Sequence, residues 1–586
     1  MLRANYRKIA VVGTAAAVLF VSGCSTLPNN TGPQVVGTYQ QQEDGPEEVI
    51  APQPGDDPDL TLRDFYQASA VPGNDHEVAR GFLTDNAREA WDASGDVMVV
   101  DSLDIVTAPA SKQSSRDNER AFTVRGTIIG RLKSGGAYVP ENEGYEAVIY
   151  MKKQDDRWRV DGLPAGVIME RNEMRNHYTP QSLYFFKQSN DVLVPDRRWL
   201  YKGGEQSEST LLTLLMEGPS SSIAPATRRA AGENVTFAGY DREQGYQFEG
   251  LADLDAQDRT LFAAQLVWTL TEAGHTGPFK VKADGGDLVE GMDSLSVDDF
   301  ADYNPEEKSS TSLSKLYALN EGNLLEVDDG VAEPVKSTLG SSGDVQSVDV
   351  ADSGLVAAVR RKSNNDFSLQ IGELDGQLQD SVEGPTLARP TFEYNGQAAW
   401  TVVDGDRIVR VVRSKTTGRI SESEVDARSI DDIEGEISVI RLSHSGARVA
   451  MIIDGHVYIA AVAQSSSGDK RIVNAREVGP EVSGSALSLD WNADGSLIVG
   501  TSSSQSPVWR IEQDGSSAST MPTGNITAPV VAVATSPTKL FITDSHAMLE
   551  LPSTVMDETN WREVSGLQGR RSSPCLLYTS PSPRDS

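Results

Sequence analysis

Residues 489–501, "LDWNADGSLIVGT", join an alternating stretch to an apolar one through a short polar turn. The turn begins D-x-N-x-D-G at Asp490, which is the first half of a calcium-loop signature. A complete loop needs a bidentate acid at its twelfth position and a helix on either side, but the twelfth residue here is Thr501. Strand-like alternation flanks the turn instead. The stretch therefore predicts a β-turn in which Gly495 adopts a positive φ, with no metal bound.

Four further stretches share this plan of strand, polar turn and apolar strand: "VDVADSGLVAAV", "FEYNGQAAWTV", "IRLSHSGARVAMI" and "VATSPTKLFIT". The turn glycines are Gly354, Gly396, Gly446 and Gly495, separated by 42, 50 and 49 residues. This is the spacing of four-stranded propeller blades, whereas a β-sandwich has no reason to keep such a period. Asp-Gly pairs at 404–405 and 454–455 predict tight hairpins within the blades. We therefore expect a β-propeller over residues 310–571.

The composition bounds the class of protein. At 586 residues the chain is long enough for roughly two to four domains. It carries 52 basic and 85 acidic side chains, a formal net charge of −33, and no basic patch follows residue 8. Because such a chain repels phosphate backbones, we expect no nucleic-acid partner.

The N-terminal residues carry an export signal. Basic residues at 3, 7 and 8 precede an apolar run at 9–21, too short to span a bilayer comfortably, which predicts a signal peptide over residues 1–23. The run ends in "VSGC", which resembles a bacterial lipobox. In that reading Cys24 takes an S-diacylglyceryl group and an N-acyl chain such as palmitate, and the body lies on the extracytoplasmic face of the plasma membrane. The other reading is an ordinary signal peptide followed by an accidental cysteine.

A polar segment separates this anchor from the body. Residues 25–58 contain six prolines, six acidic side chains and no Lys or Arg. Such a stretch cannot bury enough apolar surface to offset its ordering entropy, so residues 24–58 are interpreted as an acidic, Pro-rich tether. The exported body has no cysteine pair, so we expect large cores to stabilise it.

Residues 59–175 predict an α+β domain. Leu60, Leu62 and Phe65 suit one face of a helix that ends at the Pro-Gly pair of 72–73, and a second helical stretch follows at 76–91. Alternating runs then occupy 97–106, 122–132 and 145–160. Helices followed by a curled antiparallel sheet suggest a cone that resembles the nuclear-transport-factor-like fold. Such cones enclose a pocket or are simply packed, and both readings stay open.

Residues 176–300 predict a second, smaller α+β domain. Ser209 can start a helix that Gly218 stops. A longer helix at about 258–273 has Asp255 placed to cap it and Gly274 placed to end it. Its run "LFAAQLVWTL" is apolar on most sides, so we expect this helix to be sandwiched between a sheet and a neighbouring element. Short strands around 235–254 and 278–284 complete the domain.

No catalytic or metal motif accompanies these domains. HExxH, G-x-S-x-G, a P-loop and CxxC are all missing from the sequence, so we predict no catalytic residue, no cofactor and no metal ligand. The six histidines, at 76, 177, 275, 444, 456 and 546, are scattered and are interpreted as surface residues. A triad assembled from distant residues, or a sugar site at a propeller mouth, stays open.

The C-terminal residues break with the rest of the chain. "CLLYTSPSPRDS" looks like a translated sequencing adapter, so residues 572–586 are interpreted as a non-native tail and left out of the fold. Propellers often close by pairing their first and last strands, which leaves the number of blades open.

This order of signal, tether, cone, small α+β domain and propeller resembles the actinobacterial LpqB lipoprotein family over residues 1 to about 571. The most specific stretches are "VLVPDRRWL" at 192–200, "LLMEGPSS" at 214–221 and "AQLVWTLT" at 264–271, which look like a GerMN domain. The propeller repeats also look like those of the TolB group. Cys24 is the one functional residue that the resemblance carries over, as the lipidated cysteine.

The resemblance implies a non-enzymatic accessory of the Mtr two-component system, which contacts the extracytoplasmic sensor domain of its histidine kinase and affects envelope homeostasis and division. The alternative is an envelope glycan-binding protein or hydrolase that uses the propeller mouth or the cone pocket. A calcium-dependent module is a third hypothesis, which the D-x-N-x-D-G stretch alone suggests.

Overall fold

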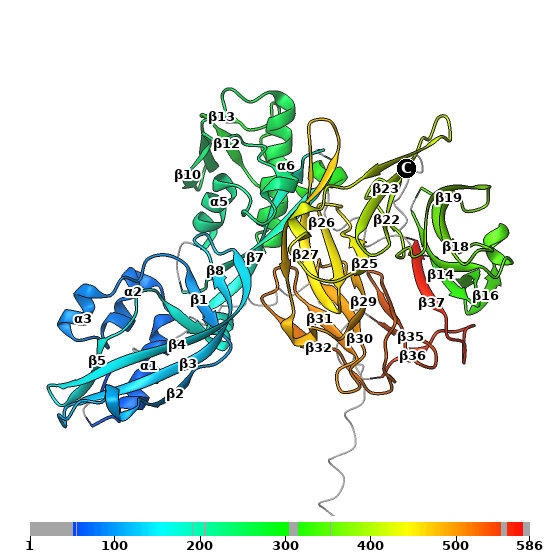
Figure 1. Cartoon of the computed structure of the whole chain (residues 1–586). Coiled ribbons are helices and arrows are strands. Elements are labelled where there is room, and N and C mark those ends of the chain that lie inside the picture. The colour runs from blue at the N-terminus through cyan, green and yellow to red at the C-terminus, as the bar shows by residue number, and fades with distance from the viewer. Residues whose placement is uncertain are drawn as a thin grey trace, which may run out of the picture. The chain divides into compact units, whose positions relative to one another are not determined.

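The computed structural model of the chain describes residues 51–53, 55–189, 191–203, 207–303, 315–351, 353–552 and 560–577 (Figure 1). The predicted signal peptide, Cys24, most of the tether and residues 578–586 lie outside these described residues. Their interpretations stay predictions. The described residues belong to one compact unit, in which the sheets have six, four or three strands.

The N-terminal domain begins with three helices: α1 (Pro58–Ser69), α2 (Gly73–Arg80) and α3 (Asp85–Ala90). Pro58 stands in the first turn of α1, where its missing N–H costs nothing, and the helix buries Leu62 and Phe65. Leu60, expected on the same apolar face, is 52% exposed. The Leu60 prediction was wrong because a helical turn of 3.6 residues carries a residue two places before Leu62 to the opposite side.

A strongly curved sheet packs against these helices. Its strands are β1 (Val97–Val100), β2 (Asp104–Thr107), β3 (Glu119–Leu132), β4 (Tyr138–Gln154), β5 (Arg157–Gly162) and β6 (Ile168–Glu170). The order is β5-β4-β3-β1-β6, with β2 paired to β3. Helices and sheet enclose one apolar core that includes Phe65, Trp91 and Ile149. The short helix α4 (Arg171–His177) leads out of the domain.

The middle domain combines two small sheets with two helices. The strands β7 (Tyr178–Lys187), β8 (Leu193–Tyr201) and β9 (Thr227–Arg228) form one sheet, in the order β8-β7-β9. The strands β10 (Thr236–Asp241), β11 (Gly245–Glu249), β12 (Val281–Ala283) and β13 (Gly286–Asp287) form the other. Helices α5 (Ser207–Glu217) and α6 (Ala256–Glu272) share one core with both sheets (Figure 1).

Helix α6 has the termini that its sequence predicts. The Asp255 side chain accepts a hydrogen bond from the Asp258 backbone N–H at 2.8 Å, and Gly274 follows the helix with φ of 90°. Two polar side chains within the apolar run hold α6 to β7: Gln265 donates to the Tyr184 carbonyl at 2.8 Å, and Thr269 accepts from the Tyr184 N–H at 3.1 Å. The helix is therefore sandwiched as expected, and it is also fixed in register.

In the described residues 315–577 the propeller has six four-stranded blades. Blade 2 is β17 (Val345–Val350), β18 (Leu355–Arg361), β19 (Phe367–Glu373) and β20 (Leu378–Gly384); blade 3 is β21 (Thr391–Phe392), β22 (Ala398–Val403), β23 (Arg407–Arg413) and β24 (Ile420–Glu424). Blade 4 is β25 (Ile437–Leu442), β26 (Arg448–Ile453), β27 (His456–Gln464) and β28 (Lys470–Glu477). Blade 5 is β29 (Ala486–Trp491), β30 (Leu497–Thr501), β31 (Val508–Ile511) and β32 (Ala518–Thr520). Blade 6 is β33 (Ala532–Thr535), β34 (Lys539–Thr543), β35 (Met548–Pro552) and β36 (Arg562–Glu563).

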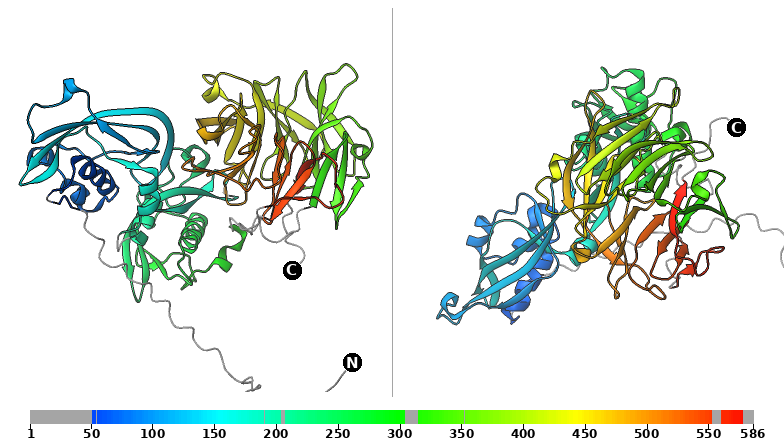
Figure 2. Two further views of the ribbon diagram at one scale, coloured as in Figure 1. Left: turned by 90° about the horizontal axis from the view of Figure 1, so that it is seen from below. Right: turned by 45° about the vertical axis from the view of Figure 1, so that its right-hand side comes forward.

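Blade 1 joins the two ends of the propeller sequence. The strands β14 (Lys315–Asn320), β15 (Asn323–Asp328) and β16 (Val331–Pro334) begin it, and β37 (Ser573–Leu577) pairs with β14 to complete it (Figures 1 and 2). We expected the propeller to end at residue 571, with residues 572–586 outside the fold. The structure instead takes residues 573–577 into the sheet, because the register Leu316↔Leu576 lets Ala318 and Leu576 pack in one core.

The turns of the blades follow the sequence prediction. Gly354, Gly396, Gly446 and Gly495 have φ of 78°, 61°, 64° and 82°. In the blade 5 turn, Asp494 Oδ1 accepts hydrogen bonds from the Ser496 N–H at 2.9 Å and from Asn492 at 3.1 Å. The D-x-N-x-D-G stretch is therefore a strand-to-strand turn between β29 and β30. The 404–405 and 454–455 pairs also have positive φ at both residues, as tight hairpins require.

Buried polar contacts join β8 of the middle domain to the propeller. Trp199 donates its indole N–H to Asp514 at 3.0 Å, and Arg448 donates to the Pro195 carbonyl at 2.7 Å. Trp199, Asp514 and Arg448 are each at most 8% exposed. Arg197 adds an ion pair with Glu512 at 2.6 Å. Because these groups would be left unpaired on separation, the two domains are held as one body.

Candidate binding channel of the propeller

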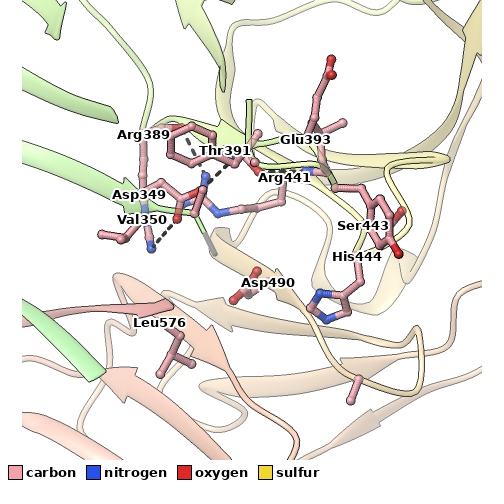
Figure 3. Close-up of a pocket in the computed structure, with 16 residues that line it drawn as sticks. Asp349, Val350, Arg389, Thr391, Glu393, Arg441, Ser443, His444, Asp490 and Leu576 are labelled. Atoms are coloured by element: carbon pink, nitrogen blue, oxygen red, sulfur yellow. Dashed lines mark hydrogen bonds and ion pairs between the residues drawn. The ribbon is translucent and has the colours of Figure 1, made fainter. Parts of the chain in front are cut away.

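In blades 2 to 6 the first strand lines the centre of the propeller, and in blade 1 the last strand, β37, does so. One repeated position on the inner strand is polar in blades 2 to 5. Counting back five residues from each turn glycine gives Asp349 on β17, Thr391 on β21, Arg441 on β25 and Asp490 on β29. All four line a cavity of about 160 Å³ that opens on the turn side of the propeller (Figure 3). The blade repeat therefore places a ring of polar groups around the channel.

Three ring side chains accept a backbone hydrogen bond from the next blade. Asp349 accepts from the Phe392 N–H at 3.0 Å, and Thr391 accepts from the Leu442 N–H at 3.2 Å. Asp490 accepts from the Thr535 N–H at 3.1 Å. Each bond satisfies an inward-facing donor that no sheet partner can reach, so the ring also fastens neighbouring blades to one another.

Arg441 is a donor at a position where the other blades have acceptors. Its Nη1 atom donates to the carbonyls of Arg389 and Pro390, which precede the first strand of blade 3, both at 3.2 Å. The same atom donates to the carbonyl of the adjacent residue, Ile440, at 2.7 Å. Asp490 accepts the next backbone N–H, that of Trp491, at 3.0 Å. Arg389 adds a second cation from the loop before β21 and lies 3.9 Å from Asp349.

Burial shapes the electrostatics of this ring. Desolvation lowers the pKa of Arg441 to about 10, with nearby Arg389 adding to the effect. Desolvation also raises the pKa of Asp349 and of Asp490, against the opposing pull of the two arginines. Both effects show that the two positive and two negative groups share a poorly hydrated space. Figure 3 shows Asp349, Arg389 and Arg441 grouped together, with Asp490 and His444 nearer the lower edge.

A second cavity lies on the other side of the ring. It has a volume of about 200 Å³, and its lining is more apolar than that of the first cavity, with Leu319, Val439, Leu487 and Val531 among its residues. Arg389 and Arg441 line both cavities. The ring therefore separates a polar mouth from an apolar mouth.

The cone of the N-terminal domain is different. Its internal cavity, beside Phe65, Tyr66 and Trp91, is only about 10 Å³, which is about the space of one water molecule. Packed side chains fill the rest. Of the two ligand sites that the sequence leaves open, the cone pocket is thus closed and the propeller mouth is present.

The histidines do not form a catalytic group in the described residues. His76 is 8% exposed and its ring contacts the Ser69 carbonyl at 3.1 Å, so the prediction of surface positions was wrong for this residue. Residues 74–76 all have positive φ, and this left-handed turn brings the imidazole against Trp91. His456 contacts Glu477 at 2.8 Å, but Ser483 donates to the same carboxylate at 2.6 Å instead of to the imidazole. In that order the serine hydroxyl does not donate to the imidazole, as it would in a catalytic triad.

No metal-binding arrangement of three or more His, Cys, Asp or Glu residues occurs within the described ranges. Cys24, the one site residue predicted from sequence, lies outside those ranges. The sequence interpretation missed the ring, although the signal was present. Aligning the repeats on their glycines puts Asp349, Arg441 and Asp490 in one column, where a channel-facing strand would normally be apolar.

Comparison with known proteins covers all three domains. Residues 51–175 match the family described as Lipoprotein LpqB, N-terminal domain; residues 182–289 match Sporulation and spore germination; and residues 322–576 match Lipoprotein LpqB beta-propeller domain. A solved propeller, the Myceliophteria thermophila Cps50 (Swd1) domain, aligns with a TM-score of 0.27 and 10% identity over 39% of this chain and 72% of that one.

Full-length relatives extend the match. Lipoprotein LpqB of Corynebacterium diphtheriae is 39% identical over 96% of this chain and 97% of its own length. The Rhodococcus jostii protein of that name is 36% identical over 96% of each chain, and the Mycobacterium tuberculosis protein is 28% identical over 95% of this chain and 97% of its own. With the cone, the middle domain and the six-bladed propeller in the matching order, the chain belongs to the actinobacterial LpqB lipoprotein family.

Proposed function

We propose that this protein is held on the extracytoplasmic face of the plasma membrane by acyl chains on Cys24, and that it acts there by contact. Three observations support the anchor: the "VSGC" stretch after an apolar run, the tether that follows it, and the family to which the chain belongs. No helix in the described part of the chain is long and apolar enough to cross a membrane. Two or three acyl chains hold a folded body at a bilayer without such a helix.

The contact partner that we propose is the extracytoplasmic domain of a two-component sensor kinase of the Mtr type. The observation that carries a contact function is the joint between β8 and the propeller, where Trp199, Asp514 and Arg448 are buried. Because the joint fixes two domains together, they offer a broad surface whose parts keep their relative positions. A preorganised surface loses little conformational entropy when it binds a partner.

We further propose that the protein is not an enzyme. The Ser483–Glu477–His456 order supports this, because the serine hydroxyl donates to the carboxylate. The alternative, an envelope glycan-binding protein or hydrolase, keeps support at the propeller mouth, where a 160 Å³ cavity has charged walls. The filled cone gives the cone pocket no comparable support.

The test is a crosslink in the native envelope. Two variants of the full lipoprotein each carry one photoreactive residue. In the first it replaces Asn474, whose side chain donates to the Ser221 carbonyl where the middle domain meets the propeller. In the second it replaces Ser466, which is exposed on the β27–β28 hairpin. We expect one of them to capture the sensor kinase. Cys24→Ser should abolish both membrane retention and capture. Capture of no kinase from either position, with the protein correctly anchored, contradicts the proposal.

A further inference from the structure

We propose that the polar mouth of the propeller channel binds a small zwitterion: an α-amino acid, or a molecule that ends in one. Its carboxylate meets the guanidinium of Arg441 and its ammonium group meets Asp490 or Asp349. This is a small-molecule site, independent of any protein that the molecule contacts.

Arg441 supplies the anion-binding part of the site. The residue is 7% exposed and lines the cavity, and its hydrogen bonds to carbonyls all come from Nη1. Within the described residues no carboxylate lies within 4 Å of this guanidinium and no acceptor contacts Nε or Nη2. A buried guanidinium with unused donors favours a carboxylate, which can accept two parallel hydrogen bonds.

The two aspartates supply the cation-binding part. Asp490 accepts one backbone N–H on each oxygen, from Thr535 and from Trp491. Asp349 accepts the Phe392 N–H on Oδ2 and the Cys575 thiol, 3.8 Å away, on Oδ1. Its nearest arginine nitrogen is 3.9 Å away, too far for a hydrogen bond. A carboxylate offers about four acceptor positions, so both retain capacity for a donor in the cavity.

The charge balance selects a zwitterion over a simple ion. Glu393 also lines the cavity, but its charge is paired with that of Arg410 at 2.6 Å. Arg389 and Arg441 then balance Asp349 and Asp490, so these four charges sum to zero. A lone anion or a lone cation would leave one buried charge without a partner, and that is strongly unfavourable in a poorly hydrated site. A ligand with one charge of each sign pairs with both and keeps the ring neutral.

The size of the cavity limits the ligand. Its volume of about 160 Å³ is close to that of an engineered cavity of about 150 Å³ that holds benzene, so it has room for a compact molecule or for the end group of a longer one. Thr391 and Ser443 line the same space and offer hydroxyl groups. Small amino acids are therefore the natural probes.

The experiment titrates the full lipoprotein in detergent with glycine, L-alanine and L-glutamate, and with acetate and methylamine as the two halves of a zwitterion. Heat of binding and melting temperature are measured. We expect at least one amino acid to bind saturably and raise the melting temperature, and neither half to do so at the same concentration. Binding of acetate as tight as that of every amino acid, or no binding of any amino acid at millimolar concentration, overturns the proposal.

Two variants locate the site. Arg441→Lys keeps the positive charge but loses the planar guanidinium that can donate two parallel hydrogen bonds, and it should weaken binding about tenfold or more.

Because changes at Arg441 also affect blade packing, Ala493→Trp provides a second test. Ala493 is exposed at the cavity rim, so an indole there obstructs the mouth without disturbing the core. Ser466→Trp places the same group on an exposed hairpin that does not line the cavity. We expect Ala493→Trp to abolish binding and Ser466→Trp to leave it unchanged. If both variants bind equally well, the ligand does not occupy this mouth.

Discussion

The cone of the N-terminal domain and the channel of the propeller are both spaces that curved β-structure encloses, but they are filled in opposite ways. In the cone, Leu62 and Phe65 of helix α1 pack into the space that the sheet encloses, and a cavity of about 10 Å³ remains. Among the described residues strands and loops alone line the channel, and the strands place Asp349, Arg441 and Asp490 on the wall of the polar cavity. The cone is stabilised by burying apolar surface, whereas the channel keeps two cavities and holds its blades through polar groups. An enclosed shape therefore does not by itself indicate a ligand site. Whether a binding cavity remains depends on the side chains that line the enclosed space.

The largest effect should come from opening the filled cone. Phe65→Ala removes a ring that is 2% exposed and packs against Tyr66 and Trp91, so we expect a loss of about 3–5 kcal/mol in the free energy of unfolding of this domain. Urea denaturation followed by tryptophan fluorescence measures it. Leu60→Ala, on the exposed side of the same helix, should change it by less than about 0.5 kcal/mol. Similar losses for both variants would mean that the cone is not packed as described.

The channel mouth should respond to pH through the carboxylate of Glu393, which lines the polar cavity. Burial opposes ionisation of Glu393, but hydrogen bonds from Arg410 at 2.6 Å and Trp400 at 2.9 Å outweigh it and hold its pKa below the usual range. Glu393→Gln should cost about 1.5–3 kcal/mol at neutral pH. A carboxylate whose pKa is lower in the folded state stabilises that state at pH values above its unfolded pKa of about 4.3. This stabilisation is lost as the pH falls through the folded-state pKa, so the stability difference between Glu393→Gln and wild type should shrink below about pH 4. Thermal melts across pH 3–7 check this.

Glu424→Gln is the matched control for that experiment, because Glu424 is exposed on β24 of the same blade. Its melting temperature should follow that of the wild type at every pH. A Glu393→Gln deficit that stays constant down to pH 3 would show that the carboxylate charge is not what stabilises this mouth.

A smaller effect is expected where a single neutral side chain joins two blades. Thr391→Val removes the acceptor for the Leu442 N–H while keeping the shape of a side chain that is 4% exposed. The expected loss is about 1 kcal/mol, with faster hydrogen exchange at Leu442. Thr391→Ser keeps the hydroxyl and should keep the protection of that amide. Equal exchange in the two variants would contradict an inter-blade role.

The smallest effect should come from adding bulk at the channel mouth. Ala493→Trp should change the free energy of unfolding by less than about 0.5 kcal/mol, because the rim is open to solvent. The same substitution in the cone, Ala68→Trp at a site that is 1% exposed, should cost about 1–3 kcal/mol or more through overpacking. Calorimetry on both variants compares the two spaces directly. A large loss for Ala493→Trp would show that the mouth is not open.

Much of the fold follows from local chemistry in the sequence. The turn glycines, the Asp-Gly hairpins and the Asp255 cap of α6 each satisfy a backbone requirement within a few residues, so a local pattern reveals them. The six-fold closure was not predictable in this way. It depends on pairing Leu316 with Leu576, residues far apart in sequence, and on a short strand within a stretch that resembles an adapter.

The channel ring also could not be predicted from local sequence patterns alone. Asp349, Arg441 and Asp490 lie next to turns, where charged residues are common, and only the geometry of the blades turns that position toward the axis. Arg389 lies outside the aligned repeats altogether and reaches the ring from a loop. A sequence pattern can align the column, but it takes the folded ring to bring the four charges together.

The pairing of β37 with β14 has a mechanical consequence. The register Lys315↔Leu577 brings the start of the propeller sequence and its last strand to the same end of one blade. A pulling force applied between these two ends would break the β14–β37 hydrogen bonds one after another, as in unzipping, instead of loading them together in shear. Under tension the propeller should open first at this seam, while the other five blades stay intact.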